Sequence, residues 1–175
     1  MSLALTKLQQ LLKCAACTLN HLWHPRTGCL VYTFILMSAA DTKQLVLSSS
    51  FTEMDRLEPY VDELKNWAQL GKEDYNRVLL TLSEAVNNAI IHGNEQDPNK
   101  QVVIQTSHDK ESNLLQISVE DEGEGFDPEA IPDPLKEENL MNEGGRGVYL
   151  IEQYSDNIEF TKNGTKVTIT FHLDS

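Results

Sequence analysis

Three polar side chains that could bind a ligand or exchange a proton with it lie four residues apart in one segment. Glu84, Asn88 and His92 supply a carboxylate, a carboxamide and an imidazole. Their spacing of i, i+4 and i+8 places all three on one side of an α-helix. A second row with the same spacing is apolar and is expected to face a core; it consists of Val78, Leu82, Val86 and Ile90. The polar row alone fits a ligand site and a solvated helix face equally well.

Two glycine-containing segments further along could hold an anionic ligand. The sequence Asp-Glu-Gly-Glu-Gly at 121–125 follows an expected strand, so its aspartate projects from a strand end while the glycines let the backbone turn tightly beside a ligand. The sequence Gly-Gly-Arg-Gly at 144–147 directly precedes a helix, whose N-terminus favours an anion. Arg146 adds a charge that can donate two parallel hydrogen bonds to a phosphate. Taken singly, the two segments also fit a surface turn and a flexible hinge.

These groups need a scaffold, which the periodicity of the apolar residues predicts. Strands are expected at 44–48, 101–106, 114–119, 158–161 and 166–173, the last two joined at an Asn-Gly turn. Helices are expected at 52–70, ending at Gly71, at 72–92, closed by Gly93 and Asn94, and at 148–154. A mixed, mostly antiparallel sheet with the helices on one face predicts an α+β fold, a two-layer α/β sandwich.

Charge and cysteine content narrow the class of protein. The chain has 175 residues and a formal net charge of −13, which repels nucleic acid and anionic lipid, so we expect neither nucleic acid nor a membrane as a partner. Bound phosphates would have to be held by backbone N–H groups, a metal ion and one or two cations. Three cysteines cannot all pair into disulfides, and no secretory signal has the ordinary shape, so a cytoplasmic location is expected.

Residues 1–40 contain no acidic side chain, and the acids begin with Asp41. We therefore divide the chain into an N-terminal extension, 1–40, and one domain, 41–175. The segment 5–23 could form a helix that ends before Pro25, or the extension could be a start-site artefact with the true start at Met37; both alternatives stay open. Two cysteines and two histidines between positions 14 and 24 suggest zinc, but on a helix the outer two lie about 15 Å apart, too far for one ion.

Together and in this order, the motifs resemble the four boxes of the GHKL ATPase superfamily of gyrase, heat-shock chaperones, histidine kinases and mismatch-repair proteins. The boxes are Glu84-x-x-x-Asn88, Asp121-x-Gly123-x-Gly125, Gly145-x-Gly147 and Gly164-Thr165. Within this superfamily, the short lid, Gly-Phe-Asp-Pro at 125–128, Ile-Pro-Asp-Pro at 131–134 and Gly-Arg-Gly at 145–147 look like the anti-sigma-factor serine/threonine kinases. The resemblance covers residues 44–173 with no box broken. It implies the Bergerat ATP-binding fold of a histidine-kinase-like ATPase domain.

Carried over residue by residue, the resemblance implies a site for ATP and Mg²⁺. Asn88 would bind the Mg²⁺ that bridges the phosphates, and Glu84 would be the general base that draws the proton from the attacking hydroxyl. Asp121 would accept a hydrogen bond from the adenine amino group. The remaining nucleotide-binding positions would be Gly123, Gly125 and Thr165 near the base and Gly145, Arg146 and Gly147 at the phosphates. His92 is expected to pack or to anchor a loop.

The resemblance implies an ATP-binding regulator that phosphorylates an antagonist (anti-anti-sigma) protein on serine or threonine, sequesters a sigma factor and forms a homodimer. Two alternatives stay open. An ATP-dependent protein-binding switch without phosphotransfer would need no base beside the metal ligand, so Glu84 favours the kinase. The catalytic part of a histidine kinase would need a phosphoacceptor histidine on a dimerisation helix, and neither His21 nor His24 is followed by the acid that such a histidine usually has.

Overall fold

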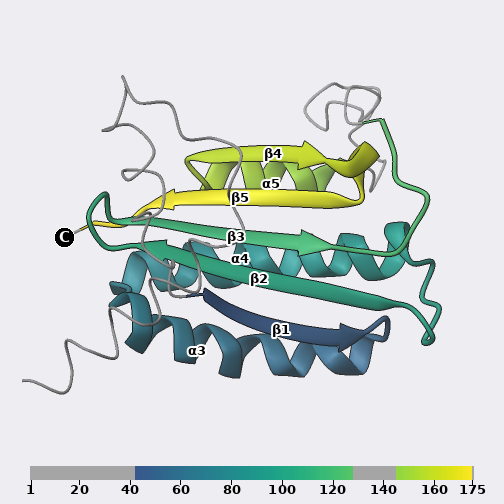
Figure 1. Ribbon diagram of the computed structural model, residues 1–175, viewed down its shortest axis with the longest axis horizontal. Coiled ribbons are helices and arrows are strands. Elements are labelled where there is room, and N and C mark those ends of the chain that lie inside the picture. The colour runs from purple at the N-terminus through teal and green to yellow at the C-terminus, as the bar shows by residue number, and fades with distance from the viewer. Residues whose placement is uncertain (1–41, 128–144, 175) are drawn as a thin grey trace, which may run out of the picture. The chain divides into compact units, whose positions relative to one another are not determined.

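A computed structural model describes residues 42–127 and 145–174, and within them one five-stranded sheet carries three α-helices on a single face (Figure 1). The strand order is β1-β2-β3-β5-β4, and every neighbouring pair is antiparallel. The strands are β1 (Thr42–Ser48), β2 (Gln101–Asp109), β3 (Leu114–Glu120), β4 (Asn157–Thr161) and β5 (Lys166–His172). The helices are α3 (Leu57–Ala68), α4 (Lys72–Asn88) and α5 (Arg146–Tyr154). The predicted α+β two-layer sandwich is confirmed.

Several predictions concern residues that lie outside the described ranges. They are the division at residue 40, the helix at 5–23, the zinc alternative and the start at Met37, together with the Ile-Pro-Asp-Pro segment at 131–134. Within the described ranges, no helix combines the length and the apolar character that crossing a membrane requires.

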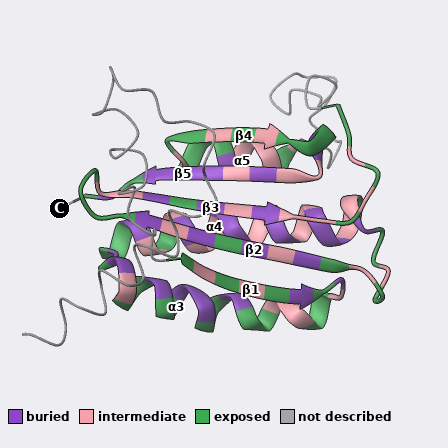
Figure 2. Cartoon of the chain, viewed as in Figure 1, coloured by how far each residue is buried: buried purple, intermediate pink, exposed green. Residues whose placement is uncertain are grey.

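The core lies between the sheet and the helices, because burial alternates along the strands (Figure 2). The inward side chains of the central strands are almost fully buried, among them Val102, Ile104, Leu115, Ile117, Val119, Ile169 and Phe171. The apolar row predicted for α4 belongs to the same core, and Val78, Leu82, Val86 and Ile90 are all 0% exposed. Since that row turns toward the sheet, Glu84 and Asn88 stay half-buried on another side of the helix.

The helix expected at 52–70 is divided and ends differently. Its first part is a 3-10 helix, Phe51–Arg56, and only Leu57–Ala68 is α-helical. Gln69 ends α3 in the left-handed conformation with φ 57°, whereas Gly71 is the N-cap of α4. The prediction that Gly71 ends the first helix was therefore wrong. A glycine between two helices marks the break, but either helix can use it as a cap.

The helix expected at 72–92 changes its geometry in its last turn. It is α-helical up to Asn88, and Ala89–Gly93 forms a π-helical turn. A π turn holds about one residue more than an α turn, so it alters the direction in which His92 and Gly93 project. The predicted alignment of three polar groups on α-helical spacing therefore applies only to Glu84 and Asn88.

Candidate functional site

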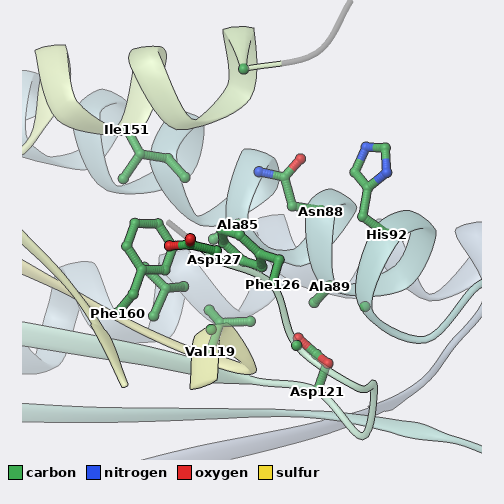
Figure 3. Close-up of a pocket in the computed structure, with 15 residues that line it drawn as sticks. Ala85, Asn88, Ala89, His92, Val119, Asp121, Phe126, Asp127, Ile151 and Phe160 are labelled. Carbon is green, nitrogen blue, oxygen red and sulfur yellow. The ribbon is translucent and has the colours of Figure 1, made fainter. Parts of the chain in front are cut away.

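A cavity of about 380 Å³ lies among α4, the π turn, α5 and the sheet (Figure 3). Its described lining residues are Ala85, Asn88, Ala89, His92, Gly93, Val119, Asp121, Gly125, Phe126, Asp127, Gly145, Ile151, Phe160, Gly164 and Val167. Most of these residues are apolar or glycine, and the polar groups are few. A cavity of this size and composition suits an organic ligand that is oriented by hydrogen bonds at a few points.

Glu84, Asn88 and Gly147 meet at one side of the cavity, although α4 and α5 are far apart in the sequence. Gly147 lies in the first turn of α5. A β-carbon built on it would lie 2.9 Å from Glu84 Oε2 and 3.1 Å from Asn88 Nδ2. The missing side chain therefore lets α5 approach the carboxylate and the carboxamide, and groups from two separate motifs come together.

The N-terminus of α5 opens at the same place. Its N-cap, Gly145, lines the cavity and has φ 85°, a conformation that favours glycine. The first N–H groups of a helix lack acceptors within the helix, and its N-terminus carries a partial positive charge. Together with Asn88 Oδ1, this end of the cavity offers both hydrogen-bond donors for an anion and an oxygen donor for a cation.

Asp121 lies on the sheet side of the cavity, where β3 ends (Figure 3). Its Oδ1 accepts a hydrogen bond from the N–H of Gly123 (2.8 Å), and its own N–H donates to the carbonyl of Thr165 (3.0 Å). Burial raises the pKa of Asp121, and the Gly123 hydrogen bond opposes this only in part. A β-carbon on Gly93 would lie 2.6 Å from both carboxylate oxygens, so a glycine is needed there. The result is a fixed, partly desolvated hydrogen-bond acceptor.

Asn94, which the sequence marks only as the end of a helix, holds the loop that carries Asp121. It is 0% exposed. Its Nδ2 donates to the carbonyl of Gln101 (2.9 Å), its Oδ1 accepts from the N–H of Glu122 (2.8 Å), and its own N–H donates to the carbonyl of Ala89 (2.8 Å). Through its backbone N–H and its side chain, this one residue ties the π turn to the start of β2 and to the residue after Asp121.

The turn between β4 and β5 supports the remaining wall. It is a 3-10 turn, Lys162–Gly164, at the predicted Asn-Gly pair. The N–H of Phe126 donates to the carbonyl of Asn163 (3.0 Å), and the rings of Phe126 and Phe160 meet edge-on with centroids 5.4 Å apart. A β-carbon on Gly125, which has φ 82°, would collide with the same carbonyl of Asn163. Gly125 therefore lets the segment before Phe126 lie flat against this turn.

The structure brings most of the sequence-predicted residues to this cavity. Four of them line it directly, namely Asn88, Asp121, Gly125 and Gly145. Three others lie next to these residues: Gly123 lies against Asp121, and Gly147 lies against both Glu84 and Asn88. Thr165 is not among the described lining residues, and its hydroxyl donates to the carbonyl of Lys162 (3.0 Å). Arg146 is exposed on the first turn of α5.

Four cavity residues differ from the sequence-based expectation. His92 was expected to pack or to anchor a loop, but its side chain is exposed and lines the cavity beside Asn88 (Figure 3). Phe126 and Asp127 line the cavity as well, and the only signal for them was the Gly-Phe-Asp-Pro sequence. Phe160 carried no signal, since an apolar strand residue that lines a cavity has the same sequence pattern as one that fills a core.

The donor groups at the cavity suit a metal ion that arrives with its ligand. Within residues 42–127 and 145–174, no group of three or more His, Cys, Asp or Glu side chains could hold a metal ion. The carboxamide oxygen of Asn88 is a hard donor of the kind that Mg²⁺ accepts, and Mg²⁺ commonly takes its other ligands from substrate phosphates and water. The residues present therefore fit a Mg²⁺ ion that is bound jointly by Asn88 and a phosphorylated ligand.

Sequence comparison identifies a family whose match spans the whole site, and several individual relatives. The family described as histidine kinase-like ATPase domain matches residues 52–171. An anti-sigma F factor from Lysinibacillus sphaericus is 27% identical over 79% of this chain and 88% of its own length. The anti-sigma F factor of Bacillus cytotoxicus is 31% identical over 59% of this chain and 73% of its own length. The anti-sigma F factor of Clostridium perfringens is 36% identical over 54% of this chain and 70% of its own length.

A solved structure has the same fold. It contains the RsbU and RsbW domains of a protein from Mycobacterium tuberculosis and aligns with a TM-score of 0.53 and 15% sequence identity. The alignment covers 74% of this chain and 31% of that chain. At this level of identity, the likeness concerns the fold alone.

Proposed function

Because this chain belongs to the histidine kinase-like ATPase family and, within it, to the family of the anti-sigma F factors, we propose that it is an ATP-dependent serine/threonine protein kinase. Its proposed protein substrate is an antagonist of the anti-anti-sigma type, and its second proposed partner is a sigma factor that it sequesters. The identity of the relatives as anti-sigma F factors supports the sigma factor as a partner. We further propose that the domain is residues 41–175, that it forms a homodimer and that it acts in the cytoplasm.

The observation that carries this proposal is the meeting of Glu84 and Asn88 at Gly147. A β-carbon there would lie within 3.1 Å of atoms of both side chains, so a carboxylate lies beside the group proposed to bind the metal ion. Mg²⁺ held by Asn88 would neutralise charge on the phosphates. In this proposal Glu84 takes the proton from the serine or threonine hydroxyl of the antagonist, as a general base does in phosphoryl transfer.

The other residues of the site have binding roles in this proposal. Asp121 accepts a hydrogen bond from the adenine amino group, and the apolar wall around Phe160 covers the base. The N-terminus of α5 with Gly145, Arg146 and Gly147 binds the phosphates. Thr165 contributes through its carbonyl, which accepts the N–H of Asp121 (3.0 Å), rather than through its hydroxyl.

The test is transfer of labelled γ-phosphate from Mg-ATP to the antagonist protein. We expect Glu84→Ala to bind Mg-ATP with unchanged affinity and to lose transfer by on the order of a hundredfold or more, whereas Glu159→Ala, an exposed glutamate on β4, keeps both. We expect Asn88→Ala to lose the Mg²⁺-dependent part of ATP binding, and Asn66→Ala on α3 to retain it. Mg-ATP binding without any transfer by the wild type would instead establish an ATP-dependent switch.

A further inference from the structure

Helices α4 and α5 run antiparallel, and one side of α4 contacts both ends of α5. Near the end of α4, Glu84 and Asn88 lie against Gly147 in the first turn of α5. Near its start, Arg77 reaches Tyr154, the last residue of α5. Arg77 and Glu84 are spaced i and i+7, so they share one side of the helix. The position of α5 is thus set from two places on the same helix.

The guanidinium of Arg77 joins several segments. Its Nε donates to the carbonyl of Tyr154 (3.1 Å), its Nη1 donates to Asp74 Oδ1 (3.2 Å) and its Nη2 donates to Asp156 Oδ2 (2.9 Å). The guanidinium carbon also lies 5.6 Å from the centroid of the Phe171 ring. Only arginine combines a planar set of donors with a charge that stacks on an aromatic ring. We call this group of contacts the Arg77 clasp.

The acidic partners in the Arg77 clasp are themselves held in place. Asp156 Oδ2 also accepts the N–H of His172 in β5 (2.9 Å). Burial acts to raise the pKa of Asp156, but the hydrogen bonds from His172 and Arg77 outweigh it and hold the pKa below its usual value. Asp74 is 2% exposed, and its Oδ2 accepts the N–H of Asp174 (3.3 Å). The clasp therefore links the end of α5 to α4 and to the sheet.

Apolar packing fixes α5 only weakly. Of its nine residues, Ile151 alone is buried, and elements with few buried contacts open at low free energy. The hydrogen bond from Arg77 to the last residue of α5 also places a positive charge at the negative end of the helix dipole. At nine residues α5 is about 14 Å long, so a displacement at its C-terminal end moves its N-terminal end as well.

We propose that Arg77 is a positioning residue for the nucleotide site: by holding the C-terminal end of α5, it sets where Gly145 and Gly147 lie relative to Glu84 and Asn88. The inference rests on the proposed function, because it takes the cavity to bind Mg-ATP. Arg77 itself does not touch the cavity, and its effect passes through the rigid helix.

The test compares Arg77→Met and Arg77→Lys with Arg56→Met in the full chain. Methionine keeps an unbranched stem without charge or donors, and lysine keeps the charge without the planar fork. Arg56 is a matched control, because it also bonds a carboxylate, Glu53 (2.6 Å), and a carbonyl, Val46 (3.3 Å), but at the start of α3. The readouts are the Mg-ATP dissociation constant by calorimetry, at a temperature where every variant is folded, and hydrogen exchange of the α5 amides.

We expect Arg77→Met to weaken Mg-ATP binding by on the order of tenfold, Arg77→Lys to restore part of that affinity, and Arg56→Met to bind as the wild type does. The amide of Tyr149, which donates to the carbonyl of Gly145 at the N-terminal end of α5 (3.0 Å), should exchange faster in Arg77→Met. Adding Asp156→Asn to Arg77→Met should weaken Mg-ATP binding little further, because both substitutions remove the same contact, the one between Arg77 and Asp156.

Wild-type Mg-ATP affinity in Arg77→Met would overturn the inference, including the case in which this variant unfolds more easily but binds normally. A wild-type chain that binds no Mg-ATP would instead contradict the proposed function. In that case hydrogen exchange still tests the role of the Arg77 clasp, and an unchanged exchange rate of the Tyr149 amide in Arg77→Met would overturn it.

Discussion

The carboxylate of Asp121 is held in place by burial, and the same burial opposes its negative charge. In its proposed role of recognising a nucleobase it must be held without free rotation and partly removed from water, and the Gly123 hydrogen bond and the contact with Gly93 hold it in this way. The same burial disfavours its charged form and raises its pKa. A group whose pKa is higher in the folded state stabilises the fold most fully at pH values below its unfolded pKa. That contribution is lost as the pH rises through the folded pKa.

We predict that Asp121→Asn unfolds at a higher urea concentration than the wild type at pH 7, and that the difference shrinks toward pH 3.5, below the ordinary aspartate pKa of about 3.9. Asparagine keeps an oxygen for the N–H of Gly123 but carries no charge. Mg-ATP affinity should fall by on the order of a hundredfold, because a required acceptor is altered. Urea titrations and calorimetry on this variant and on Asp55→Asn, an exposed control, measure both effects. Lower stability together with unchanged ATP affinity would contradict both parts.

At the scale of elements, the approach of α5 to α4 depends on the absence of a side chain at Gly147. A β-carbon there would press on the ends of two side chains, Glu84 and Asn88, and not on backbone. Such ends can move aside, so the fold should tolerate an added β-carbon at this position. The positions of the Glu84 and Asn88 side chains in the site, however, should change.

We predict that Gly147→Ala lowers phosphotransfer by on the order of tenfold to a hundredfold, while its unfolding midpoint stays close to that of the wild type. Gly71→Ala is the matched control, because a β-carbon there meets only Asp74 Oδ2 at 3.9 Å, an ordinary contact. Initial rates of transfer and urea titrations check the two statements. Full activity in Gly147→Ala would show that Glu84 and Asn88 can rearrange without loss.

The same elements explain how much of the site the sequence could predict. Asn88 and Asp121 were identified because each belongs to a short local motif, and the alternation of apolar residues placed the strands. Arg77 and Asn94 were not identified, because their partners lie far along the chain and single polar residues on a helix or in a loop carry no pattern. The π turn was not predicted either, since apolar spacing alone does not distinguish it from an α turn.

At the scale of the whole molecule, charge opposes compactness. The net charge is −13, and self-repulsion between like charges destabilises a folded chain. The ion pairs of the described residues include partly exposed ones such as Lys43 with Glu63 (3.5 Å), and ion pairs near the surface contribute little to stability. Repulsion is therefore expected to dominate the response to salt.

We predict that the chain becomes more stable when NaCl rises from 10 mM to 200 mM, because the screening length falls from about 30 Å to below 10 Å. Thermal unfolding at pH 7 without nucleotide measures the shift. Choline chloride serves as the control for specific sodium binding and should give the same increase. A midpoint that falls with either salt would mean that attractive pairs outweigh the repulsion.

The π turn Ala89–Gly93 restricts the length of this segment more than its composition. Substituting one of its apolar residues changes the local packing only, but deleting one residue would let the helix continue in α geometry. Everything after it would then rotate by about 100° and retreat by about 1.5 Å. Asn94 would lose its register with Gln101 and Glu122, and Gly93 would no longer lie under Asp121. Insertions and deletions here should therefore be far less tolerated than point changes.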